Sequence, residues 1–337
     1  MLSKLGAGTE VMPASSRGNS NSKLVVLIYV SACVATGVAV VFALAGLRNK
    51  KRKSLKALEF VSWRDAEALE ECKEVRKILV VDTTHATREC LTHHKMRYAP
   101  PATLRSDTTT AMVLNAIAQR HEVLSSATGV TVDHFDIDAF LSVFSACNPQ
   151  VAETFSDVIR EAAHIGDFRE LDLSRPSADN ALKVCCWINS LERQLFSRPF
   201  EGGDERKWPY FLGDGRFASF LHALHSSADA QRHLWGAEYD KVMADLNILN
   251  HGGQVRRYDD IGLVVVEAPT ALHYYALFSV SRGCDTVLSS YPASTPPSIT
   301  VKRCHEIEQK YTQYVNLESR DTWYNTFVCV CVEYVSA

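Results

Sequence analysis

The sequence predicts an α/β protein with a mostly parallel sheet core, a helical middle region and a smaller sheet-containing C-terminal lobe, preceded by one transmembrane helix. Three observations predict this class. Short apolar runs alternate with helical patterns up to about residue 150, helical periodicity dominates residues 150–250, and period-two alternation returns after residue 250. Strands that alternate with helices favour parallel pairing, because each helix carries the chain back across the sheet.

The uncharged run at residues 24–47, LVVLIYVSACVATGVAVVFALAGL, predicts the transmembrane helix. As a helix it is roughly 36 Å long, which is enough to cross a bilayer core of about 30 Å. It is longer than the apolar core of a cleaved signal peptide, which has about 7 to 15 residues. A basic stretch follows at 48–53, so the positive-inside rule places the C-terminal part in the cytosol.

The expected localisation is therefore a membrane, with the lipid bilayer as partner through residues 24–47. The Ser-rich, acid-poor leader is also compatible with an organellar targeting signal, so the choice of membrane stays open. The predicted organisation is a polar leader (1–23), the transmembrane helix (24–47), a basic juxtamembrane and linker segment (48–75), an α/β domain with a helical second half (76–250) and a C-terminal α/β or α+β lobe (251–337).

Composition narrows the class of partner. The 337 residues are 46% hydrophobic and carry a formal net charge of -3, which suits one or two globular domains. This charge argues against nucleic acid as a partner, because nucleic-acid-binding proteins usually present a basic face to the phosphates. The ten cysteines include no CxxC pair and no paired spacing of a disulfide framework, which fits a reducing compartment. No feature identifies a protein partner.

Local patterns predict the individual elements of the soluble part. Between residues 76 and 250 the predicted elements are strands at 77–82 and 129–133, a helix at 106–121 capped by Ser106 or Asp107, a helix at 139–147 that ends before Asn148-Pro149, a solvated loop at 201–216 and a long helix at 217–246. Beyond residue 250 the predicted strands are IGLVVVEAP, SITVKRCHEI, QKYTQYVNLE and FVCVCVEYV.

The stretch TVDHFDIDAF predicts a metal site. If the strand that starts at 129 continues to about residue 138, then His134, Asp136 and Asp138 lie on one side of it. An imidazole and two carboxylates at the end of a strand suit Mn²⁺ or Mg²⁺, which we expect as the cofactor. The alternative interpretation is structural, with Asp138 capping a helix from Ala139 and Asp136 holding the turn.

Upstream residues extend the candidate site. Asp82 ends the strand at 77–82, and His93-His94 precede the helix whose N-terminus, at residues 108–110, is expected beside the site and able to attract phosphate. Asp82 is therefore predicted as a further metal ligand, and His93 and His94 as catalytic residues together with Asp136 and Asp138. His164 and Asp167, near the end of another predicted helix, are candidates for the same metal shell.

Three enzyme families have motifs that resemble parts of the stretch TVDHFDIDAF. HFDIDAFLSV resembles the opening motif of lesion-bypass DNA polymerases, but Phe144 stands at that motif's acidic position. FDIDAF resembles the D-x-D-G-T loop of haloacid-dehalogenase-like phosphatases, with Ala139 and Phe140 in place of Gly and Thr. H-x-D-x-D is similar to the first motif of the DHH phosphoesterases, which implies Mn²⁺. Here Thr92-His93-His94 matches the Asp-His-His motif except at its acid, and it precedes H-x-D-x-D instead of following it.

The wider chain resembles an uncharacterised protein family of plants and bacteria. The resembling pieces are spread over residues 78 to 320 and include THHKMRYAPPATLRSDTTTAMVLNAI, DHFDIDAFLSVFSACNP, AAHIGDF, LHYYALFS, CDTVL and QKYTQYVNLESR. This resemblance implies that the chain is a member of that family, but it implies no particular reaction. The sequence thus favours a single-pass membrane protein with a divalent-metal site that hydrolyses a phosphoester of a phosphorylated small molecule. The alternative is a non-catalytic, membrane-tethered scaffold or ligand-binding protein.

Overall fold

The computed structural model describes residues 55–71, 77–94, 100–196, 206–284, 286–291, 298–305 and 311–316. The chain divides into two compact units, Met1–Ser54 and Leu55–Ala337, and all described residues belong to the second. The predicted transmembrane helix at 24–47 and the predicted strand FVCVCVEYV lie outside the described residues. Among the helices that are described, none combines the length and the apolar character needed to cross a bilayer.

The first sheet has four strands, all parallel, which confirms the predicted α/β class. Its strands are β1 (Glu59–Phe60), β2 (Ile78–Val81), β3 (Cys90–Leu91) and β4 (Gly129–Thr131), in the order β1-β4-β2-β3. Every residue of β2, β3 and β4 is buried, as expected for a parallel sheet covered by helices. Because β2 lies between β3 and β4, the carboxyl ends of these three strands meet at one edge of the sheet.

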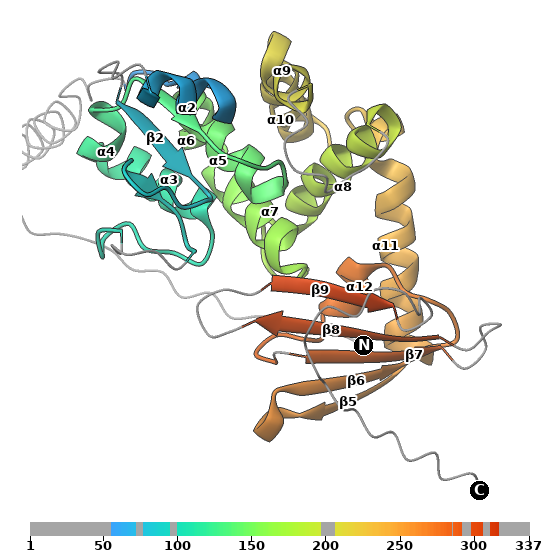
Figure 1. Ribbon diagram of the computed structural model, residues 1–337. Coiled ribbons are helices and arrows are strands. Elements are labelled where there is room, and N and C mark those ends of the chain that lie inside the picture. The colour runs from blue at the N-terminus through green and yellow to red at the C-terminus, as the bar shows by residue number, and fades with distance from the viewer. Residues whose placement is uncertain are drawn as a thin grey trace, which may run out of the picture. The chain divides into compact units, whose positions relative to one another are not determined.

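Helices pack around the first sheet and make up the middle of the chain (Figure 1). They are α2 (Trp63–Glu71), α3 (Thr109–Gln119), α4 (Glu122–Ser125), α5 (Ile137–Cys147), α6 (Pro149–Thr154), α7 (Ser156–Phe168), α8 (Ala178–Leu195), α9 (Lys207–Leu212), α10 (Arg216–Ser226) and α11 (Arg232–Gly252). The cap of α3 is Thr108, whose hydroxyl accepts from the Ala111 N–H, and not Ser106 or Asp107 as predicted. The single helix predicted at 217–246 is interrupted between α10 and α11, where Gln231 is left-handed.

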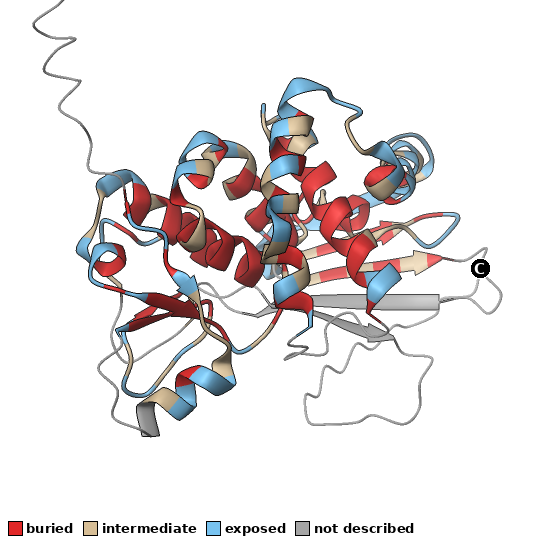
Figure 2. Ribbon diagram, turned by 90° about the horizontal axis from the view of Figure 1, so that it is seen from above, coloured by how far each residue is buried: buried red, intermediate tan, exposed pale blue. Residues whose placement is uncertain are grey.

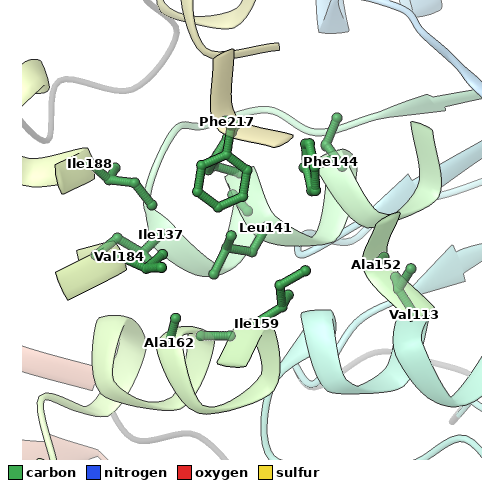
Figure 3. Packing of buried hydrophobic residues seen from close by; sticks show 14 of the residues in the cluster. Val113, Ile137, Leu141, Phe144, Ala152, Ile159, Ala162, Val184, Ile188 and Phe217 are labelled. Atoms are coloured by element: carbon green, nitrogen blue, oxygen red, sulfur yellow. The ribbon is translucent and has the colours of Figure 1, made fainter. Parts of the chain in front are cut away.

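The main hydrophobic core lies between these helices. Figure 2 shows buried residues running through the helical layer, and Figure 3 shows side chains from α3, α5, α7, α8 and α10 packed together. α5 is central: all of its residues from Ile137 to Ala146 are buried. Aromatic rings fill the space around it, with Phe144 and Phe217 in an edge-to-face pair whose centroids are 4.7 Å apart. The core thus fixes the N-terminus of α5, where the predicted metal motif lies.

Gly166 sets the close approach of α7 to α5. A Cβ atom added at Gly166 would lie 2.4 Å from Cγ2 of Ile137, far inside van der Waals contact. Only glycine therefore allows the C-terminal end of α7 to pack against the first turn of α5. Asp167, the next residue, is carried to the same place.

The stretch at 201–216 is not the solvated loop that its composition predicts. Its described part contains α9, in which Lys207, Trp208 and Phe211 are buried. Trp208 stacks on Phe60 of β1 with ring centroids 4.8 Å apart. Tertiary packing has overridden the loop-like composition, because two buried aromatic residues, Trp208 and Phe211, anchor the segment in the core.

A second sheet, of five strands, follows α11, as the sequence predicts (Figure 1). Its strands are β5 (Gln254–Tyr258), β6 (Leu263–Glu267), β7 (Thr286–Tyr291), β8 (Ser298–His305) and β9 (Tyr311–Asn316), paired in sequence order. Only β6 and β7 are parallel to each other. The short helix α12 (Tyr274–Phe278) contributes Leu277 and Phe278 to a separate small core with Val264, Val266 and Val287. The predicted domain boundaries remain predictions.

A buried polar network joins α8, α11 and α12. At its centre Glu238 is 7% exposed and accepts hydrogen bonds from Asn189, Ser190, Arg193, His273 and Tyr274. Burial alone would raise the pKa of Glu238, but the hydrogen bonds from His273 and Arg193 hold it below its ordinary value. This carboxylate is therefore saturated with donors.

Candidate metal centre

Three adjacent strand ends deliver the candidate ligands to one place. Asp82 directly follows β2, His93 and His94 follow β3, and His134 follows β4. His134 Nε2 lies 3.4 Å from Asp82 Oδ2, while His93 Nδ1 and His94 Nε2 lie 3.5 and 3.6 Å from Asp82 Oδ1. The structure thus brings together residues that are more than fifty positions apart in the chain, Asp82 and His134, at the sheet edge where ligands of α/β proteins usually bind.

Asp82 is the middle of this arrangement. Its side chain is 2% exposed, and its backbone has a φ of 53°, a left-handed conformation that non-glycine residues adopt at a cost. The two carboxylate oxygens face different histidines, with Oδ1 toward His93 and His94 and Oδ2 toward His134. The strained turn therefore aims one carboxylate at two groups of ligands.

The motif HFDID does not continue the strand, and this prediction is wrong. β4 ends at Thr131, and Asp136 is the N-cap of α5, its Oδ1 accepting from the Ala139 N–H at 2.8 Å. The helix begins at Ile137, so Asp138 lies in its first turn and does not cap it. Asp136 Oδ2 is still directed at the cluster, 3.5 Å from His134 Nε2. A turn and a helix start replace the strand geometry, yet the side chains meet.

Asp138 occupies the helix N-terminus that the sequence predicts as a phosphate site. Its Oδ2 and Oδ1 accept from the backbone N–H groups of Thr109 and Thr110 at 2.8 and 2.9 Å. The free donors at the start of α3 are thus used by a carboxylate from within the chain. The Thr109 hydroxyl donates to Asp82 Oδ1 at 2.8 Å, so the first turn of α3 holds both acids.

A second acid, Asp133, orients the ring of His134 through its Nδ1 atom. Its Nδ1 lies 2.7 Å from Asp133 Oδ1, and the Thr83 hydroxyl donates to the other oxygen of Asp133 at 2.9 Å. This pairing leaves Nε2 directed at Asp82 and Asp136, as in the carboxylate–histidine pairs that support metal ligands. Burial opposes protonation of His134, but the hydrogen bonds that its ring donates to Asp133, Asp136 and Asp82 raise its pKa above the ordinary value.

Asp167 enters the cluster from the end of α7. Its Oδ2 lies 3.6 Å from His93 Nε2, and this buried oxygen has no hydrogen-bond partner. His93 Nδ1 faces the other way, 3.6 Å from Asp138 Oδ2. His164, the other candidate from this helix, pairs instead with Glu170 at 3.8 Å. A buried oxygen without a donor is costly in a folded protein, and a bound cation would satisfy it.

The surroundings of the cluster disfavour the charged forms of two of its aspartates. Burial, together with repulsion from neighbouring aspartates, raises the pKa values of Asp138 and Asp167 well above the ordinary range. Burial also lowers the pKa of His93, so this imidazole tends to be neutral. Buried carboxylates crowded together beside the neutral imidazole of His93 are an environment that a divalent cation stabilises.

Acidic and histidine residues of this cluster could hold a metal ion. Three groups have ligand atoms within 4.8 Å of one another: Asp82 with His93 and His94; Asp82 with His134 and Asp136; and His93 with Asp138 and Asp167. Asp82 belongs to two groups and His93 to two, so the groups form one continuous site. All six predicted site residues are in it.

Fold and site together define an α/β protein with a buried histidine–aspartate cluster at the carboxyl edge of a parallel sheet. The chain belongs to DUF6687, a family of unknown function, whose model matches residues 56–325. No curated protein and no solved structure matches the chain. The predicted membership of an uncharacterised family is confirmed, whereas the resemblance to DHH phosphoesterases finds no support in these comparisons.

Sequence reasoning missed the residues that hold the ligands in place. Asp133 and Thr83 orient His134, and the Thr109 hydroxyl bonds to Asp82. Asp133 adjoins His134, which is a usable signal, because a ligand histidine usually donates to a carboxylate or carbonyl. Thr83 carries no such signal, and Thr109 was expected beside the site as part of a helix N-terminus that attracts phosphate, not as a hydroxyl that bonds to Asp82.

Proposed function

We propose that the protein is a metal-dependent phosphohydrolase that holds two divalent cations bridged by Asp82. Asp82 carries this proposal: each oxygen of its carboxylate faces a different set of ligands, with His93 and His94 on one side and His134 and Asp136 on the other. A carboxylate that bridges two ions needs this arrangement. The mix of imidazole nitrogens and carboxylate oxygens favours Mn²⁺ or Mg²⁺ over a structural zinc.

The surrounding residues support a role beyond passive binding. A pair of divalent ions would lower the pKa of water and neutralise charge on a phosphoryl group. Asp133 fixes the tautomer of His134, and Asp138 fixes α3 so that Thr109 can hold Asp82. The side chains of His134 and Asp136 are about one-third exposed, whereas Asp82 is buried, so a substrate would reach the cluster from the His134 side.

Asp136→Asn tests the proposal with little risk to the fold. Asparagine is as good an N-cap as aspartate, so α5 keeps its cap while the cluster loses a charged ligand. We expect the full-length protein to bind Mn²⁺ and to hydrolyse members of a phosphodiester and nucleotide panel, and Asp136→Asn to lose both. Asp240→Asn on the exposed face of α11 is the matched control and should behave as wild type.

Two results would refute the proposal. One is a wild-type protein that retains neither Mn²⁺ nor Mg²⁺ and acts on no member of the panels. The other is an Asp136→Asn protein that cannot be distinguished from wild type in binding and turnover.

One observation favours a second candidate, a non-catalytic metal-binding scaffold. Thr92 replaces the acid that precedes the two histidines in the DHH motif; it is buried, and its hydroxyl accepts from the His94 N–H at 3.2 Å. At this position the chain thus has a turn-forming hydroxyl instead of a charged ligand. Mn²⁺ binding without hydrolysis of any panel member would support the scaffold.

A further inference from the structure

A buried ion pair lies beneath the loop that carries His134 and Asp136. Lys207, the first residue of α9, is 0% exposed, and its Nζ lies 2.7 Å from Oε1 of Glu192 on α8. Glu192 is 4% exposed. Removing two such charges from water is costly, and well-packed apolar residues at such places are often equally stable or more so. The pair therefore calls for an explanation other than stability.

The contacts of Lys207 point to the metal loop. Its ammonium lies 5.3 Å from the centroid of the Phe135 ring, a cation–π contact in a buried setting. Phe135 is the residue between His134 and Asp136, and it is 2% exposed. Two further rings of α9, Trp208 and Phe211, pack on Phe135 with centroids 5.1 and 5.0 Å away. Three residues of one short helix thus enclose the single side chain that separates two ligands.

Small displacements of this loop would change the ligand geometry. His134 Nε2 and Asp136 Oδ2 are 3.5 Å apart and lie on either side of Phe135 in the chain. A rotation of the Phe135 backbone would move both side chains away from Asp82, because no regular secondary structure holds residues 132–136. Metal sites tolerate errors of only about 0.5 Å in ligand position.

We propose that Lys207 and Glu192 are positioning residues of the metal centre, which act through Phe135 to fix the loop that presents His134 and Asp136. The inference rests on the proposed metal-dependent function. The ion pair sets where α9 sits, α9 encloses Phe135, and Phe135 fixes the two ligands. Two apolar residues of equal volume would fill the space but would not specify one orientation of the Phe135 ring.

The test compares two double variants of the full-length protein. Lys207→Met/Glu192→Met removes both charges and leaves no buried charge unpaired. Lys183→Met/Asp179→Met is the control: Lys183 is also buried, pairs at 2.7 Å with Asp179, whose side chain is half exposed, and lies 5.4 Å from the Trp235 ring centroid. Mn²⁺ binding is followed by electron paramagnetic resonance, with His134→Ala identifying the ion held by His134 and Asp136.

We expect the Lys207/Glu192 variant to keep its thermal midpoint and to bind that one ion about tenfold more weakly, with the other ion unaffected. Amide hydrogen exchange of residues 130–140 should also become about tenfold faster, and neither quantity should change in the control. Exchange is measured on the metal-free protein, so faster exchange in the Lys207/Glu192 variant while wild type binds no Mn²⁺ would show that the loop positioning holds and that the proposed function fails. Unchanged exchange, or an equal effect in both double variants, would overturn it.

Discussion

Two buried polar regions of this protein use similar residues in opposite ways. The candidate metal cluster gathers Asp82, Asp136, Asp138 and Asp167 around three histidines, and one oxygen of Asp167 has no donor. The network between α8, α11 and α12 instead surrounds the single carboxylate of Glu238 with five donors. In the first region a buried carboxylate oxygen is left without a donor, and in the second five donors surround one carboxylate.

This difference in hydrogen bonding distinguishes a candidate binding site from a polar network that only connects helices. A saturated carboxylate gains nothing from a ligand, and the pKa of Glu238 is held below its ordinary value although burial opposes this. The acid-rich cluster is different. Burial and repulsion between neighbouring aspartates raise the pKa values of Asp138 and Asp167, and a bound cation would stabilise their charged forms. Burial of acid and histidine alone does not indicate a function; the balance of acceptors against donors does.

The sharpest way to break the comparison is Asp82→Asn. We expect Mn²⁺ affinity to fall by more than about 100-fold, beyond the loss typical of an outer-shell residue, because both proposed ion positions share this carboxylate. Stability without metal should stay equal or rise, since one of several repelling charges disappears. Isothermal titration and thermal unfolding of the metal-free protein measure the two effects. A variant that keeps its affinity, or that unfolds much more easily, would remove the distinction between the regions.

Glu238→Gln should give the opposite pattern. We expect the free energy of unfolding to fall by about 2 kcal/mol, because the amide leaves Arg193 and His273 without their charged partner. Mn²⁺ affinity should be unchanged. Denaturant unfolding at neutral pH measures the loss, and Asp82→Asn in the same assay is the control.

The pH dependence checks the cause of this loss. A carboxylate whose pKa is lowered on folding contributes stability above its unfolded pKa, near 4.5, and loses it as pH falls through the lower folded pKa. The gap in unfolding free energy between wild type and Glu238→Gln should therefore shrink as pH drops below about 4.5. A gap that stays constant there would show that packing, and not charge, sets the contribution of Glu238.

The sequence predicted which residues meet in the cluster better than the geometry that joins them. Asp82, His93, His94 and His134 could be found because polar residues that directly follow apolar strands meet at one edge of a parallel sheet. The strand predicted up to Asp138 failed because period-two spacing also occurs in a turn that leads into a helix, and Asp136 is a strong N-cap.

Other features had no local signal. α9 was predicted as loop because glycines and charges surround its two buried aromatic residues, and only tertiary packing shows that they reach Phe135. Gly166 gives a weak signal in retrospect: a glycine late in an amphipathic helix often marks close contact, but the partner, Ile137, depends on the fold. Contacts between distant segments cannot be derived from the pattern of either segment alone.

Asp133→Asn probes the edge of the metal cluster and should have the smallest effect. Asparagine can still accept from His134 Nδ1, but it lacks the charge that makes the imidazole a stronger ligand. We expect Mn²⁺ affinity to fall by about tenfold, with little change in stability because the side chain of Asp133 is 42% exposed. Asp172→Asn, which alters a partly exposed aspartate bonded to Ser174, is the control. If both variants bind Mn²⁺ like wild type, Asp133 belongs with the saturated, structural acids, and the boundary between the two regions must be drawn inside the cluster, between Asp133 and His134.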